Sequence, residues 1–503
     1  MTLKSSRSTN SSLARNGTSR LQFAQRETSL NRLDRICSNS CAAADKPGTP
    51  SRRERERIVH MAKRFGRWET VGTLGEGGQA HTFLVRNTDD GSTGWVLKRL
   101  KNPKRIDRFK REIEMLTRLQ SPHIPAVVDA DIGEKDSYLV TAYVGENLTA
   151  LPDLVEPRAI FERFRGVVTA VHDAHAQGVV HRDIKPDNIV VDQNGKPYLI
   201  DFGICADMAS GVMLTTVEGF GNAAFAAPEC GAGSLDAAQE ASDVYSLGKV
   251  LHWMTSRRTV FVRERFEHGS LAVADPHVAQ YISAIIDRTV REDPGSRWTS
   301  TDLLQGVEWV LAKIGEHSAF KSSGIEVITD GFGPRDECDP GGSRSATGAK
   351  RGNPPAEHHV AQSFFVRDPV DLDEIGVGLR LRNGSTGMAE VRLTKGDLAT
   401  PSDHDSDVLE RWPVSVCDSD TVEVLRLQSA GTPTLGPHEI YWVILSATDE
   451  NSDVEWISAA PLLRPRAVWI AERHGAEDWE GVESVGGPGM AFRVLARPTK
   501  LGH

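Results

Sequence analysis

The stretch from Val179 to Val191 constrains the fold of this chain more than any other segment. It reads VVHRDIKPDNIVV, so charged and amide side chains are packed between two apolar, strand-like runs. The run LIDFG, residues 199–203, follows shortly after it. Asp183, Asn188 and Asp201 all offer hard oxygen donors, and Mg²⁺ is usually held by one or two carboxylates together with substrate phosphates. The two segments therefore predict a site for a metal ion and phosphates.

A glycine-rich turn, GEGGQA at residues 75–80, lies between two strand-like runs upstream. Glycine lets the backbone approach phosphates closely and leaves its N–H groups free to bind them. Lys98 ends the apolar run WVLK, and Glu112 lies in the amphipathic stretch RFKREIEMLTRL, where it could pair with that lysine. Taken singly, these features also fit a hairpin loop, a strand-edge charge and a solvated helix face. Together with the first site they predict nucleotide and metal binding for phosphoryl transfer.

In this order and at these spacings, the motifs resemble those of eukaryotic-type protein kinases, and specifically of the soluble, bacterial-like serine/threonine kinases. The resemblance covers residues 66–314, roughly half of the chain. It implies an α+β bilobal fold, with ATP and Mg²⁺ bound between a small β-rich lobe and a larger helical lobe. It also implies transfer of the γ-phosphate of ATP to serine or threonine hydroxyls of protein substrates, with autophosphorylation in signalling.

The resemblance assigns catalytic roles to individual positions. Lys98 matches the lysine that pairs with the α- and β-phosphates, and Glu112 matches its partner on the neighbouring helix. Asp183 matches the base that accepts the proton of the substrate hydroxyl. Lys185 matches the lysine that stabilises the transferring phosphate in serine/threonine kinases. Asn188 and Asp201 match the metal ligands.

The same resemblance assigns the nucleotide contacts. Gly75, Glu76 and Gly77 match the loop that covers ATP. Thr141, Ala142 and Val144 match the segment that binds adenine, with Thr141 as a small gatekeeper.

The resemblance also implies an activation segment between Asp201 and Glu229. Thr215 and Thr216 are its candidate phosphosites, and Thr216 resembles the autophosphorylation site that would pair with Arg182. The alternative is that both threonines only keep a mobile loop soluble. Outside this segment, Arg297 matches the arginine that pairs with Glu229, and Asp243 matches the buried aspartate that braces the catalytic loop.

Four positions depart from the family pattern. Ala80 replaces the third loop glycine, and Thr82 and Val96 replace a valine and an alanine that line the adenine site. Asn222 replaces a threonine that contacts the catalytic aspartate and lysine. We expect altered rather than lost activity, because every residue assigned to the chemistry is present.

Composition and charge limit which other partners and locations the sequence supports. Residues 1–67 hold 15 Lys and Arg against 5 Asp and Glu, whereas the rest of the chain holds 44 against 64. A basic segment can touch an acidic body, anionic lipid or nucleic acid, but a solvated tail is the simpler reading and no aromatic residues interleave with the charges. The sequence contains no apolar stretch of about 18 residues, so no membrane span is expected. Six scattered cysteines predict no disulfide framework, and we expect a cytoplasmic protein.

The domain organisation follows from shifts in composition. We expect a basic disordered tail at 1–65, the kinase-like domain at 66–314, a Gly- and Pro-rich flexible linker at 315–363, and a β-rich domain at 364–503. Short alternating runs separated by turn signals predict a small all-β, sandwich-like C-terminal domain. That domain is expected to bind a ligand or a protein.

Two other functions compete with a protein kinase. A small-molecule kinase shares the nucleotide site but is disfavoured by Lys185 and by the pairing of Glu229 with Arg297. A pseudokinase scaffold would bind partners without turnover. Phosphate transfer to a generic protein acceptor distinguishes these alternatives.

Overall fold

The computed structural model describes residues 63–76, 80–133, 136–202, 224–231, 240–257, 275–330, 339–351, 356–382, 385–417, 421–437, 439–449, 451–458, 467–474, 479–485 and 490–499. Lys63–His503 forms one compact unit. Gly77, Thr215, Thr216 and Asn222 lie outside the described residues. Within the described part of the chain, no helix is both long and apolar enough to cross a membrane.

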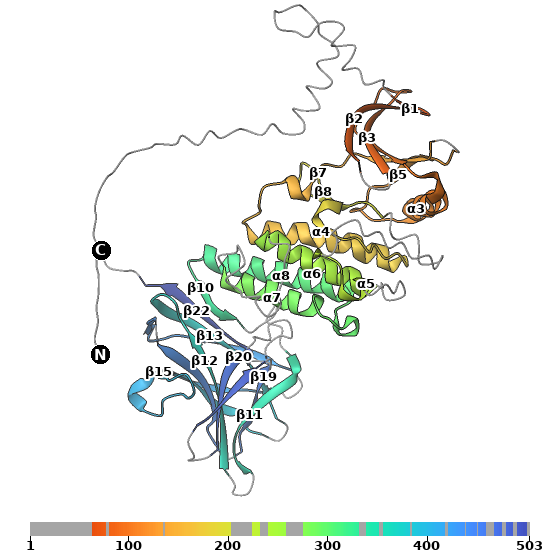
Figure 1. The fold of residues 1–503 in the computed structure, drawn as a ribbon. Coiled ribbons are helices and arrows are strands. Elements are labelled where there is room, and N and C mark those ends of the chain that lie inside the picture. The colour runs from red at the N-terminus through yellow and green to blue at the C-terminus, as the bar shows by residue number, and fades with distance from the viewer. Residues whose placement is uncertain are drawn as a thin grey trace, which may run out of the picture. The chain divides into compact units, whose positions relative to one another are not determined.

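The N-terminal part of this unit is a six-stranded antiparallel sheet with the order β1-β2-β3-β4-β6-β5. Its strands are β1 (Arg64–Phe65), β2 (Trp68–Glu76), β3 (Ala80–Asn87), β4 (Trp95–Leu100), β5 (Val127–Asp131) and β6 (Tyr138–Ala142). The turn η1 (Pro103–Arg105) leads into helix α3 (Ile106–Arg118), which lies beside the sheet in Figure 1. Phe65 is buried in the core of this sheet, so ordered structure begins before the predicted tail boundary at residue 65.

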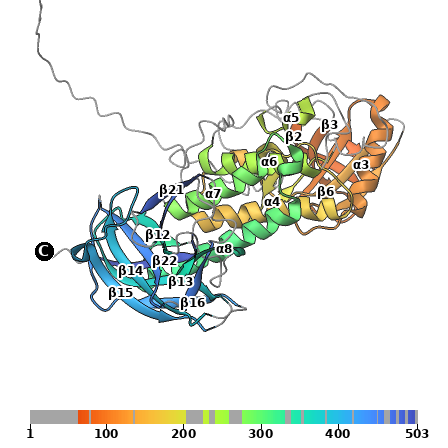
Figure 2. The same ribbon diagram turned by 90° about the horizontal axis from the view of Figure 1, so that it is seen from below.

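The next part is mainly helical. Its helices are α4 (Pro157–Ala176), α5 (Pro228–Gly231), α6 (Glu240–Ser256), α7 (Pro276–Thr289) and α8 (Ser300–Ser322), with the 3₁₀ turns η2 (Leu148–Ala150), η3 (Pro186–Asn188) and η9 (Pro294–Ser296). A small sheet joins β7 (Glu146–Asn147), β8 (Ile189–Val191) and β9 (Pro197–Leu199). Helix α4 packs against both α6 and α8, as Figure 2 shows. The predicted bilobal α+β fold is thereby confirmed.

Local sequence explains where the long helices begin. Before α4, the Glu156 side chain accepts hydrogen bonds from the N–H groups of Arg158 and Ala159, and Pro157 occupies the first helical position. Before α8, Thr299 and Asp302 form a capping box in which each side chain accepts from the other residue's backbone. These caps fix the first turns of two long helices that pack against each other.

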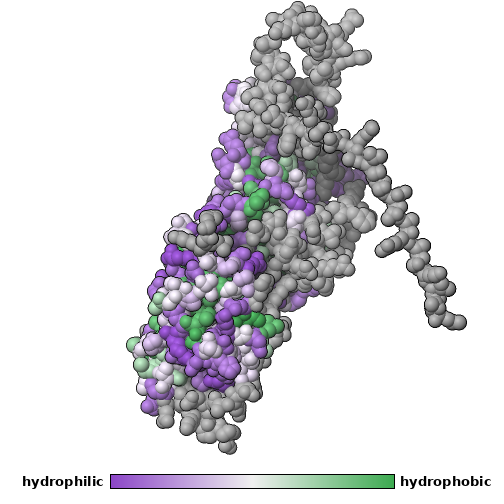
Figure 3. Space-filling model, turned by 90° about the vertical axis from the view of Figure 1, so that its left-hand side faces the viewer, coloured by the Kyte–Doolittle hydropathy of each residue, from purple (hydrophilic) through white to green (hydrophobic). Residues whose placement is uncertain are grey.

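The C-terminal region is rich in antiparallel strands. They are β10 (Glu326–Asp330), β11 (Asp339–Arg351), β12 (Ala356–Phe365), β13 (Val370–Leu381), β14 (Met388–Gly396), β15 (Val408–Ser415), β16 (Glu423–Gln428), β17 (Thr434–Leu435), β18 (Ile440–Ala447), β19 (Asp453–Ser458), β20 (Ala467–His474), β21 (Glu480–Val485) and β22 (Phe492–Pro498), with the turn η11 (Asp405–Asp407). Their core includes the fully buried Tyr441 and Trp456. On the face shown in Figure 3, hydrophobic side chains form small patches among hydrophilic ones.

The segment expected to be a flexible linker, residues 315–363, differs from that expectation. Helix α8 continues through it to Ser322, and strands β10, β11 and β12 follow. Strand β11 pairs with β19 on one side and with β12 on the other. These neighbouring strands hold β11 in an extended conformation, although its Gly-rich sequence does not indicate a strand. The predicted boundary at 364 therefore falls inside β12 rather than before the first strand.

Candidate active site

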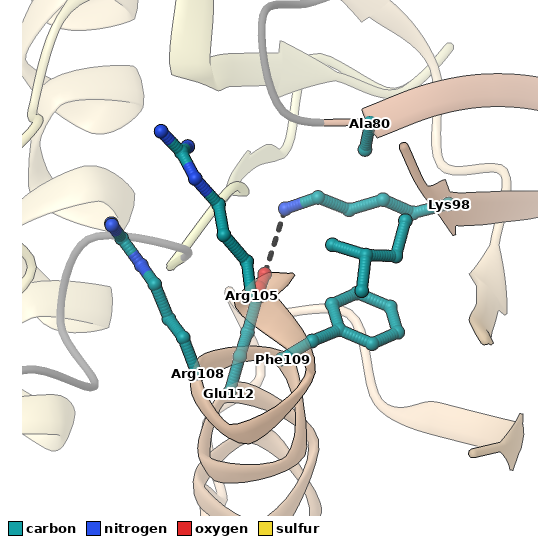
Figure 4. A pocket seen from close by; sticks show the side chains of 7 residues that line it. Ala80, Lys98, Arg105, Arg108, Phe109 and Glu112 are labelled. Carbon is teal, nitrogen blue, oxygen red and sulfur yellow. Dashed lines mark hydrogen bonds and ion pairs between the residues drawn. The ribbon is translucent and has the colours of Figure 1, made fainter. Parts of the chain in front are cut away.

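Lys98 and Glu112 meet across the small lobe as predicted. Lys98 lies on β4, between β3 and β6, and its Nζ donates to Glu112 Oε1 at 2.7 Å. Glu112 is buried on α3, beside the apolar residues that hold this helix against the sheet. Figure 4 shows the Lys98 side chain reaching toward Glu112, with Arg108 on the same helix and Arg105 at the end of η1 extending into this region.

Lys98 also contacts Asp201, which lies far away in sequence. Its Nζ donates to Asp201 Oδ1 at 2.6 Å. Burial alone would lower the pKa of Lys98, but the charges of Glu112 and Asp201 outweigh it and raise that pKa above its usual value. The Lys98 charge in turn lowers the pKa of Asp201 to about 2, against the opposing effect of burial. Both side chains are therefore ionised at neutral pH.

The pair predicts an acid-dependent loss of stability. Because the folded pKa of Asp201 lies below its ordinary value of 3.8, its stabilising effect is present above about pH 4 and is lost as the pH falls toward 2. The difference in free energy of unfolding between wild type and Asp201→Asn, measured with urea, should shrink over that range. Half of the Asp201 side chain is exposed, so solvent keeps the effect small. Asp107→Asn, at an exposed position on α3, controls for loss of a surface charge, and a pH-independent Asp201→Asn difference would contradict the prediction.

Asp183 lies at the centre of a short hydrogen-bonded loop. Its Oδ2 accepts from Lys185 Nζ at 2.7 Å and from Asn188 Nδ2 at 2.9 Å. Asn188 belongs to η3, and strand β8 follows it directly. Ile200 N–H donates to the backbone carbonyl of Asn188, which links the loop to the segment carrying Asp201. The structure therefore brings Asp183, Lys185 and Asn188 together as the sequence predicts.

Asp243 on α6 holds the backbone of this loop by hydrogen bonds. Arg182 has a φ of 69°, a left-handed conformation that costs a non-glycine residue about 1–3 kcal/mol. Asp243 Oδ1 accepts from Arg182 N–H and Oδ2 from His181 N–H, both at 2.7 Å. These bonds hold the strained backbone and thereby fix the direction of the Asp183 side chain.

The positions assigned to the nucleotide border the same region. Thr141 and Ala142 end β6, where Thr141 pairs with Val96 and Ala142 with Trp95, and Val144 follows in the connection to β7. Gly75 lies on β2 opposite Thr82, with no described atom within 4 Å of where a Cβ would be, so the chain around it leaves room. The backbone of Glu76 pairs with His81.

Three of the four departures lie on strands that frame this region. Val96 precedes Lys98 by two residues on β4, so their side chains share one face of the strand. Thr82 pairs directly with Lys98 in the neighbouring strand, and Ala80 is buried at the start of β3. The larger Val96 side chain thus lies beside the predicted gatekeeper Thr141.

A second buried ion pair supports the end of the activation segment. Arg297 donates from Nη1 to Glu229 Oε1 at 2.6 Å and from Nη2 to Oε2 at 2.8 Å. Burial alone would raise the pKa of Glu229, but the hydrogen bond from Arg297 keeps it below its usual value. The predicted pairing of these residues is confirmed, and its two parallel bonds fix the start of α5.

Sequence reasoning missed two supporting residues and one contact. His175 on α4 and Ser300 on α8 extend the hydrogen bonds of Asp243. The direct bond from Lys98 to Asp201 was also not predicted. The only sequence signal of His175 and Ser300 is a polar residue on an otherwise apolar helix face, and many unrelated positions share that signal.

The two lobes, the paired Lys98 and Glu112, and the braced Asp183 loop define a protein kinase fold and site. Residues 68–310 match the family model described as the protein kinase domain. These residues therefore carry a protein kinase domain, and together with the curated relatives the match supports a bacterial-like serine/threonine kinase.

Curated relatives agree with that assignment. A probable serine/threonine-protein kinase of Streptomyces coelicolor is 32% identical over 47% of this chain and 38% of its own length. Serine/threonine-protein kinase PrkC of Bacillus subtilis is 30% identical over 47% of this chain and 39% of its own length. Probable serine/threonine-protein kinase PkwA of Thermomonospora curvata is 30% identical over 48% of this chain and 34% of its own length. The chain thus spans less than half of the length of these relatives.

Proposed function

We propose that this chain is a serine/threonine protein kinase that transfers the γ-phosphate of ATP to hydroxyl groups of protein substrates. The observation that carries the proposal is the Asp183 carboxylate, held by Lys185 and Asn188 on a loop that Asp243 braces. A carboxylate in this setting can accept the proton of an attacking hydroxyl. Lys185, beside it, offsets the negative charge that develops during transfer.

The nucleotide would lie between the lobes. Lys98, positioned by Glu112, would orient its phosphates in exchange for part of its contact with Asp201. Asn188 donates to Asp183 through Nδ2, so its carbonyl oxygen is the atom suited to a cation. Mg²⁺ would be held by Asn188 and Asp201 together with the substrate phosphates. The metal would supply charge neutralisation at those phosphates.

The test uses the purified full chain with Mg²⁺, labelled ATP and a generic protein acceptor, followed by mapping of phosphosites. We expect label on serine or threonine with the wild type and almost none with Asp183→Ala. No transfer by the wild type, with or without acceptor, would favour a scaffold that lacks turnover.

We further propose that phosphorylation of Thr216 activates the enzyme. Arg182 supports this, because its three buried guanidinium nitrogens have no hydrogen-bond partner among the described residues. A phosphate can supply such a partner, and one charge-assisted hydrogen bond contributes about 1.5–3 kcal/mol. Thr216→Ala should therefore lower the initial rate of acceptor phosphorylation by roughly tenfold after preincubation with ATP. Thr215→Ala is the matched control, and a larger effect there would identify Thr215 as the site instead.

The C-terminal region is proposed to be an all-β, sandwich-like domain that binds a ligand or protein partner. Strands β12 and β18 support this, because they bury apolar side chains on both faces. Val360 and Val443 belong to one core, whereas Ala361 and Trp442 belong to another. A cytoplasmic location is proposed because the reaction draws on ATP and because scattered cysteines fit a reducing compartment.

A further inference from the structure

Helix α8 begins at a buried chain of hydrogen bonds that ends on the catalytic loop. Ser300 Oγ and His175 Nδ1 are 3.1 Å apart, and His175 Nε2 donates to Asp243 Oδ2 at 2.9 Å. Asp243 then accepts the N–H groups of His181 and Arg182. Serine, histidine and aspartate also form the nucleophilic triads of hydrolases, but here all three are buried from substrate, so they serve to position the loop.

The same helix is a continuous rod. It runs from Ser300 to Ser322, which corresponds to a length of about 35 Å at 1.5 Å per residue. Its buried face packs against α4, the helix that carries His175. Because a packed helix moves as a body, a displacement at its C-terminal end changes the position of Ser300 at the other.

The C-terminal half of α8 is bound to the strand-rich region by a buried cluster of charges. Lys313 Nζ donates to Asp330 Oδ2 at 2.7 Å, and neither side chain is exposed. His317 Nε2 donates to the same oxygen at 3.1 Å. Arg493 Nε on β22 lies 3.1 Å from Asp330 Oδ1. Asp330 on β10 thus joins α8 to β22, the strand with which β10 pairs.

Helix α7 also contacts β10 and α8 beside this cluster of charges. His277 Nε2 donates to the carbonyl of Val327 on β10 at 2.9 Å, and its ring lies 5.0 Å from that of His317. Glu316 also pairs with Lys313, at 3.1 Å. We define Lys313, His317, Asp330 and Arg493 as the junction. A charged cluster buried in this way holds its elements in one arrangement, since moving any member would leave another charge unpaired.

We propose that the junction fixes the position of α8 and, through Ser300 and His175, the geometry of the catalytic loop. The C-terminal strands then act as a positioning element for phosphoryl transfer, and a partner that shifts β10 would change the catalytic rate. This inference rests on the proposed kinase function. Its test also measures hydrogen exchange at backbone amides, which does not depend on kinase activity.

The test compares Asp330→Asn with Glu455→Gln in the full chain. Glu455 is a buried carboxylate paired with Arg380 among the C-terminal strands outside the junction, so it is the matched control. We expect Asp330→Asn to lower kcat roughly tenfold with an unchanged KM for ATP, and to speed hydrogen exchange at the His181 and Arg182 amides. Glu455→Gln should change neither kcat nor the hydrogen exchange of these amides. Faster exchange in β10 without any change in kcat or in these two amides would overturn the proposal.

Ser300→Ala tests the route. If α8 acts through Ser300, then adding Asp330→Asn to Ser300→Ala should lower kcat little further, whereas independent effects would multiply. Multiplied effects would overturn the route through Ser300.

Two further measurements keep the test decisive. His317→Ala removes one hydrogen bond to Asp330 and leaves Lys313 paired, so it replaces Asp330→Asn if that variant does not fold. We expect it to lower kcat as well. An unchanged kcat would count against the proposal. If the wild type transfers no phosphate, the proposed function fails, while amide exchange at His181 and Arg182 still decides the coupling.

Discussion

Asp183→Asn is expected to lower the rate of phosphoryl transfer by about 10²–10⁴-fold, the usual contribution of a positioned base. Asparagine keeps the shape of the side chain but cannot accept the proton of the attacking hydroxyl. The bonds from Lys185 and Asn188 to Asp183 are aimed at a carboxylate, so the change also disturbs the charge balance of the loop. Because Asp183 has no assigned contact with the nucleotide, kcat should fall with little change in KM for ATP.

The matched control for this change is Asp187→Asn. Asp187 lies in the same loop, but it is exposed. Initial rates with labelled ATP and excess acceptor should stay within a few-fold of wild type for this variant. A similar loss for both variants would mean that the loop tolerates no change in charge, and a rate near wild type for Asp183→Asn would remove Asp183 from the role of base.

The catalytic loop could be predicted from sequence because its chemistry demands particular residue types within a short span. Asp183, Lys185 and Asn188 are neighbours in the chain, so local spacing already places them together. The pairing of Lys98 with Glu112 was predictable for a related reason, since a strand and an amphipathic helix restrict where each side chain can point. Asp201 turning toward Lys98 was not, because that contact depends on how the two lobes meet and on a backbone φ of 64° at Asp201.

The segment after Ile314 shows where composition misleads. Gly, Pro and charged residues in β11 indicate a linker when read alone, yet β19 and β12 impose an extended conformation from both sides. The last turns of α8 carry Lys313 and His317, whose partner Asp330 is supplied by β10. Burial of polar groups by distant partners leaves no periodic pattern, so neither the helix extension nor the junction had a local signal.

Arg297→Met is expected to lower the free energy of unfolding by about 3–5 kcal/mol, as breaking a buried ion pair from one side does. The Arg297 side chain is fully buried, and that of Glu229 is 13% exposed. Arg297 also donates to the carbonyls of Ala241, Arg291 and Glu292, so its loss leaves a buried carboxylate and three carbonyls without this donor. Urea unfolding of the full chain measures the change.

Arg291→Met is the control, because Arg291 is exposed nearby and its side chain donates locally to the Asp287 carbonyl; the change should cost less than about 0.5 kcal/mol. The double variant Glu229→Leu with Arg297→Met then separates charge from packing. If the penalty arises from an unpaired carboxylate, removing that carboxylate should restore part of the stability lost in Arg297→Met. If the double variant is as unstable as the sum of the single changes, the arginine acts instead through its bonds to the three carbonyls, and the stability of α5 depends on that backbone support rather than on the ion pair.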